Sequence, residues 1–89
     1  PKEIDKLIAA RIRNIRRRRK ISQKRLSEKS GVSLGSVKRF ESSGEISLIS
    51  LTKIAIALDL ENELEGLFEH VPFLSIEEII NGEDEKTES

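Results

Sequence analysis

Three small side chains at predicted helix boundaries constrain the fold of this chain more than any other feature. Ser22 can cap a helix, because its hydroxyl can accept a hydrogen bond from an unpaired backbone N–H in the first turn. Gly31 suits the left-handed conformation just past a helix end. Ser33 can cap the next helix in the same way. The spacing predicts two short helices, over 23–30 and about 34–42, joined by a tight turn.

Apolar periodicity predicts further helices on both sides of this pair. A first helix is expected over about 4–19, a fourth from Ser47 to about Leu58, and a fifth over about 62–71, where Pro72 ends it. The fourth helix carries apolar residues on two sides, so it should be covered twice. The apolar stripe of the first helix consists of Ile4, Leu7, Ile8, Ile12 and Ile15.

These elements predict an all-α fold with a single core, since 89 residues suffice for one domain. The helix-turn-helix pattern occupies 22–42 within a domain of residues 1–82. After Pro72, Ser75 and Glu78 form a candidate capping box for one last short helical turn. Residues 83–89 have nothing to bury and should form a disordered acidic tail.

The net charge of zero conceals a division of the chain into a basic and an acidic half. Residues 1–40 hold 14 Lys or Arg and three acids, whereas residues 41–89 hold two Lys and 13 acids. Such an asymmetry indicates one half that faces a polyanion. The acidic half is expected to repel DNA or to meet a protein partner.

Residues 11–60 contain, in this order, Arg11-Ile12-Arg13, Ile21-Ser22-Gln23, Leu26-Ser27-Glu28, Gly31-Val32-Ser33, Ser36-Val37, Phe40-Glu41, Leu51, Lys53-Ile54-Ala55 and Ala57-Leu58. In their joint order and spacing these pieces resemble the phage repressor and Cro family (Xre family) of helix-turn-helix regulators. The resemblance implies a five-helix lambda-repressor-like DNA-binding domain with a short C-terminal extension. The sequence departs from the family's pattern in one loop, where Glu45, Ile46 and Ser47 stand and the family usually has a proline.

The resemblance assigns candidate DNA contacts to the second and third helices. Gln23, the first residue of its helix, is expected to contact phosphate or to brace a recognition residue. The third helix should read the major groove, where Arg39 or Lys38 can pair with guanine. Leu34 has two readings of equal weight, contact with a thymine methyl group or core packing beside Val37. The remaining exposed positions at the start of this helix are Ser33, Gly35 and Ser36.

The basic run from Arg16 to Lys20 cannot all contact one groove, because consecutive helical residues point in different directions. Arg17, Arg18 and Lys20 are candidates for phosphate neutralisation. Arg16 is instead expected to form a structural salt bridge with Glu41, since the two stand at the family's spacing around Gln23.

Catalysis finds no support, because His70 is the only histidine, Cys and Tyr are absent, and no Gly-rich phosphate loop or metal-ligand cluster is present. We therefore expect no enzyme and no cofactor. A cytoplasmic, nucleoid-associated protein fits the lack of cysteine and of a signal-peptide stretch. Pro1 at the start is expected if an initiator Met has been removed.

The sequence predicts a transcriptional regulator, a repressor in the first instance, that binds double-stranded DNA as a homodimer on a palindromic operator. The homodimer is suggested by surplus apolar residues in the second half of the chain, although folding back of the C-terminal segment would account for them equally well. Two alternatives stay open, an antitoxin whose acidic half binds a toxin, and a protein-protein adaptor with the same fold.

Overall fold

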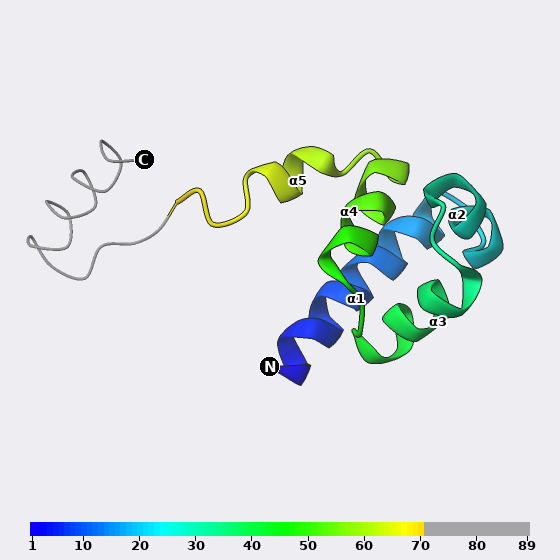
Figure 1. Ribbon diagram of the computed structural model, residues 1–89, viewed down its shortest axis with the longest axis horizontal. Coiled ribbons are helices and arrows are strands. Elements are labelled where there is room, and N and C mark those ends of the chain that lie inside the picture. The colour runs from blue at the N-terminus through cyan, green and yellow to red at the C-terminus, as the bar shows by residue number, and fades with distance from the viewer. Residues whose placement is uncertain (71–89) are drawn as a thin grey trace, which may run out of the picture.

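The computed structural model describes residues 1–70, which form five α-helices and no strand. The first helix is the longest, and the next two form the helix-turn-helix unit beside its C-terminal half (Figure 1). The helices are α1 (Lys2–Arg18), α2 (Gln23–Ser30), α3 (Leu34–Ser43), α4 (Leu48–Ala57) and α5 (Glu61–Glu65).

Serine hydroxyls cap the N-termini of α2, α3 and α4. The Arg25 N–H donates to Ser22 Oγ, and the equivalent bonds are made to Ser33 and Ser47 by the residues three positions later. Gly31 (φ 77°) caps the C-terminus of α2 and Gly44 (φ 83°) that of α3, both in the left-handed region that favours glycine. Local sequence therefore fixes where the helix-turn-helix unit starts, turns and stops.

The helices α1, α2, α3 and α4 together form one apolar core. Helix α3 packs against α1 and α2, and α4 packs against α2. Ser27 lies where α2 approaches this core, and its hydroxyl donates to the Val32 carbonyl oxygen at 2.6 Å, so its extra polarity is satisfied. The buried apolar residues are Ala9, Ile12, Leu26, Val32, Val37, Phe40, Ile54, Ala55 and Leu58.

Helix α5 is shorter than the predicted 62–71. It ends at Glu65, because Gly66 has low helix propensity and begins a turn in which Phe68 takes a φ of 63°. Helix α1 begins two residues earlier than predicted, at Lys2, and ends one earlier, at Arg18. The predicted last helical turn after Pro72 and the predicted tail of 83–89 lie outside the described residues.

The apolar stripe of α1 is only partly covered. Ile12 is buried and Ile15 half-buried, but Ile4, Leu7 and Ile8 in the N-terminal half are exposed among the described residues. The periodicity thus predicted the helix correctly without predicting which part of its stripe enters the core. Within residues 1–70 no helix combines the length and the apolar character needed to span a membrane.

Gly44 and Gly31 provide a matched pair of substitutions. An added Cβ at Gly31 meets nothing within 4 Å, so Gly31→Ala should cost only backbone strain, about 1 kcal/mol. An added Cβ at Gly44 would lie 2.8 Å from the backbone of Asp5 in α1, so Gly44→Ala should cost roughly 2–4 kcal/mol. Urea unfolding of both variants measures this difference, and equal costs would mean that α1 does not approach the α3–α4 loop.

Candidate nucleic-acid interface

Helix α3 has one face in the core and one in solvent. Val37, Phe40 and Glu41 are buried, which fixes the rotation of the helix about its axis. Residues half a turn away from them therefore point outward. The exposed side of α3 carries Gly35, Ser36, Lys38, Arg39 and Ser42.

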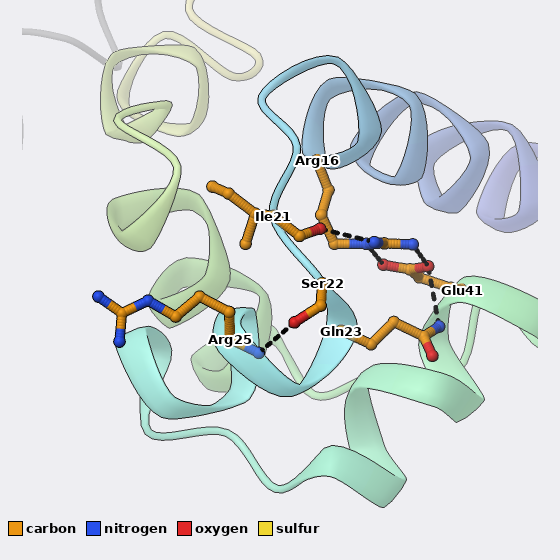
Figure 2. Close-up of polar contacts among 6 residues, drawn as sticks. All are labelled: Arg16, Ile21, Ser22, Gln23, Arg25 and Glu41. Carbon is orange, nitrogen blue, oxygen red and sulfur yellow. Dashed lines mark hydrogen bonds and ion pairs between the residues drawn. The ribbon is translucent and has the colours of Figure 1, made fainter.

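A buried ion pair ties α3 to α1. Arg16 Nε donates to Glu41 Oε2 at 2.7 Å and Arg16 Nη2 donates to Glu41 Oε1 at 2.8 Å, so the pair is bidentate (Figure 2). Arg16 Nη1 also donates to the Ile21 carbonyl oxygen at 2.8 Å, in the segment between α1 and α2. Both side chains are less than 10% exposed. This pair therefore fixes three segments relative to one another.

Gln23 completes this cluster from the first turn of α2. Its Nε2 donates to Glu41 Oε1 at 3.1 Å, so the amide points at the ion pair (Figure 2). The family's two options for this residue were a phosphate contact or a brace for a recognition residue. In this chain its protein partner is Glu41, on the inner side of α3, and not an outward-facing residue of that helix.

The charge of Glu41 is stabilised by its partners. Burial raises the pKa of its carboxyl, but hydrogen bonds from Arg16 and Gln23 and the positive charges of Arg16 and Arg13 outweigh burial, so the pKa lies below its ordinary value of 4.5. The folded protein consequently holds Glu41 ionised at neutral pH.

The first turn of α3 presents hydroxyl groups at its N-terminus. Ser33 Oγ accepts from the Ser36 N–H at 3.2 Å and donates to Ser36 Oγ at 2.8 Å, and both residues are exposed. Leu34 between them is half-buried, which is compatible with either of its two readings. Ser33 therefore has a structural task as a cap beside any contact with DNA.

The basic residues at the end of α1 point to different sides of the helix. The positive charge of Arg13 lies close enough to Glu41 of α3 to help lower the pKa of that carboxyl. Arg17 lies one turn after Arg13 on the same face, whereas Arg18 is turned about 100° further away from α3. Lys20 follows in the turn with a φ of 56°, and Arg17, Arg18 and Lys20 are all exposed.

A shallow recess of about 350 Å³ lies between the outward face of α3 and the start of α4. Ser36 and Arg39 line one side, and the α3–α4 loop with the first turn of α4 lines the other. The start of α4 brings unpaired backbone N–H groups to this side of the protein. The remaining lining residues are Glu45, Ile46 and Ser47 of the loop and Ser50 of the first turn of α4.

The sequence analysis missed the start of α4 as a part of this interface, because it named no residue of α4 as a DNA contact. The available signal was Ser47, an N-cap that follows Gly44 by three residues and so starts a helix close to the end of α3. Only the left-handed turn at Gly44 brings that helix start beside Arg39. Residues 1–70 contain no group of three His, Cys, Asp or Glu that could hold a metal ion.

Comparison with known proteins gives one match. The family described as helix-turn-helix matches residues 12–61, more than half of the chain and the part that contains α2, α3 and α4. No curated protein and no solved structure matches the chain.

The low pKa of Glu41 predicts a pH-dependent contribution to stability. A carboxyl whose pKa is lower in the folded state stabilises the fold above its unfolded pKa, near 4.5, and loses this effect as pH falls through the folded value. Glu41→Gln should therefore cost about 3 kcal/mol at pH 7, because Arg16 loses its charged partner.

The difference between wild type and Glu41→Gln in free energy of unfolding should narrow as pH falls below about 4.5. Urea unfolding at pH 7, 5 and 3 tests this. Other carboxyls titrate in both proteins and largely cancel in the comparison. If the difference in free energy of unfolding between the two proteins does not change with pH, the charge of Glu41 does not contribute to stability.

Proposed function

The chain belongs to the helix-turn-helix family of phage repressor- and Cro-like DNA-binding regulators, and we propose that it is a repressor that binds a palindromic operator as a homodimer. It is a sequence-specific DNA-binding regulator by its family. The observation that carries the finer proposal is the outward face of α3. A buried anchor of Val37, Phe40 and Glu41 holds this face rigidly while Lys38 and Arg39 stay exposed.

Base reading in this proposal is assigned mainly to Arg39. It lies near the centre of the exposed side of α3, and its guanidinium suits the two acceptors of guanine in the major groove. Lys38 and Ser36 flank it, and Gly35 leaves room for close approach of the DNA. Because this helix offers few hydrogen-bond donors, DNA shape and phosphate contacts should carry a larger share of recognition.

Phosphate contacts are assigned to cations and helix N-termini around this face. Arg17 is exposed and lies nearer than Arg18 to the side of α1 on which Arg16 contacts α3, and Lys20 stands in the exposed turn that follows. Gln23 Nε2 has a second N–H beyond the one that it donates to Glu41, and this N–H can donate to a phosphate oxygen. The backbone N–H groups at the start of α4, beside the recess, add a further anion-binding position.

The operator and Arg39 can be tested together. Selection from a random pool of duplexes should return a two-fold symmetric sequence with half-sites about one helical turn apart, roughly 34–36 Å. Arg39→Ala should weaken binding to that sequence by about 1–3 kcal/mol and relax selectivity at one base pair of each half-site.

The matched control is Arg25→Ala. Arg25 is exposed on α2 but projects from the side opposite to Gln23 (Figure 2), so operator selectivity should not change. A selection that returns no consensus, with Arg39→Ala binding like wild type, would contradict the proposal and favour a protein-protein adaptor.

The orientation of α1 predicts that adjacent arginines differ. Arg17→Ala should reduce the slope of log affinity against log salt by about 1, because one phosphate contact is lost. Arg18→Ala should leave the slope unchanged, since Arg18 points away from α3. Fluorescence anisotropy over a salt series measures both slopes, and equal slopes in the two variants would contradict this assignment of Arg17.

A further inference from the structure

Glu45 places a negative charge inside the candidate nucleic-acid interface. It lines the recess beside α3 together with Ser36 and Arg39, and it is the only acid among the residues that line it. Its side chain is exposed. Because a carboxylate repels the phosphates of DNA, an acid at this place weakens binding unless a cation of the protein pairs with it.

Hydrogen bonds hold the backbone of Glu45 close to that of Arg39. Ser43 Oγ donates to the Arg39 carbonyl oxygen at 2.7 Å and accepts from the Glu45 N–H at 3.2 Å. Gly44 follows Ser43 in the left-handed conformation (φ 83°), and its N–H donates to the Phe40 carbonyl oxygen at 2.8 Å. The loop therefore turns back along the end of α3, and the backbone fixes where Glu45 stands relative to Arg39.

Neither charge has an ion-pair partner in the part of the chain that the structure describes. Within residues 1–70 the ion pairs are those of the N-terminus with Glu3 and of Arg16 with Glu41. Arg39 and Glu45 both have long, exposed side chains, and exposed side chains change rotamer within nanoseconds. Since the two side chains border one recess, rotation about their own bonds can bring the opposite charges together.

An arginine that reads guanine keeps unused donors. Its guanidinium carries five N–H groups in one plane, and guanine accepts two of them through O6 and N7. The remaining N–H groups can donate to a carboxylate in the same plane. A carboxylate beside Arg39 would thus hold the plane of the guanidinium in one orientation while the opposite edge contacts the base.

We propose that Glu45 is a positioning residue for Arg39, and that in the complex with DNA its carboxylate accepts from the guanidinium edge that does not face the base. This inference rests on the base reading by Arg39 proposed above and names the residue that sharpens it. Bound DNA shields the recess from water and salt, which strengthens an ion pair that solvent screens in the free protein. The pairing also offsets the repulsion between Glu45 and nearby phosphates.

Two roles of this carboxylate predict different results for one substitution. Glu45→Gln keeps the size of the side chain and removes its charge. If Glu45 only repelled DNA, the variant would bind every duplex more tightly by the same factor. If Glu45 orients Arg39, the variant loses discrimination at the base pair that Arg39 contacts and keeps it at all others.

Competition binding with the selected operator, and with duplexes changed at one base pair at a time, measures this discrimination. Arg39→Ala first identifies the base pair that Arg39 reads. Glu45→Gln should reduce discrimination at that base pair about 10-fold, because charge-assisted hydrogen bonds to Arg39 are lost. In a chain that already carries Arg39→Ala, Glu45→Gln should have no further effect on discrimination.

The matched control is Glu63→Gln. Glu63 is an exposed acid on α5, outside the recess, so this variant loses the same charge but should discriminate like wild type at every base pair. Glu45 is exposed too, so both variants should unfold at the thermal midpoint of the wild type.

Equal tightening on every duplex by Glu45→Gln would overturn the proposal, because Glu45 would then only repel DNA. The same loss of discrimination in the Arg39→Ala background would overturn it as well, since Glu45 would not act through Arg39. If Arg39→Ala relaxes one base pair and Glu45→Gln relaxes none, this inference fails and the base reading stands. If Arg39→Ala leaves every preference unchanged, or selection returns no consensus, the base reading fails and this inference with it.

Discussion

The Arg16–Glu41 ion pair is the contact on which the geometry of this domain depends. It joins the end of α1 to the inner side of α3, and through Gln23 and the Ile21 carbonyl oxygen it also fixes the start of α2. Two buried charges are tolerated because each is hydrogen-bonded by the other and by neighbouring groups. Since Glu41 follows Arg39 by two residues on α3, the contact that closes the core also orients the outward face.

Two left-handed glycines, one after α2 and one after α3, determine which elements lie beside the outward face of α3. Gly31 lets α3 follow α2 after a turn of three residues, and Gly44 lets α4 begin beside the end of α3. Because an added Cβ at Gly44 would lie 2.8 Å from the backbone of Asp5, the same turn brings the α3–α4 loop close to α1. One outward side therefore combines a basic helix face with a helix N-terminus, and both suit a duplex with anionic phosphates.

Basic residues and exposed apolar residues lie mostly on different elements of the domain. The basic residues belong mainly to α1, α2 and α3, whereas the exposed apolar residues lie on α1, α4 and after α5. DNA binding needs the basic surface uncovered. Apart from α1, which carries both kinds of residue, the two sets lie on different elements.

The sequence alone determined the family, the all-α class and the boundaries of α2 and α3, because caps, left-handed glycines and apolar spacing act within a few residues of the chain. It also singled out Arg16 and Glu41, through the resemblance. It overextended α5 and gave no account of the exposed start of the α1 stripe. It also missed the recess beside Arg39. Those features depend on which side of a helix meets which neighbour, and only the packing of α1, α3 and α4 decides that.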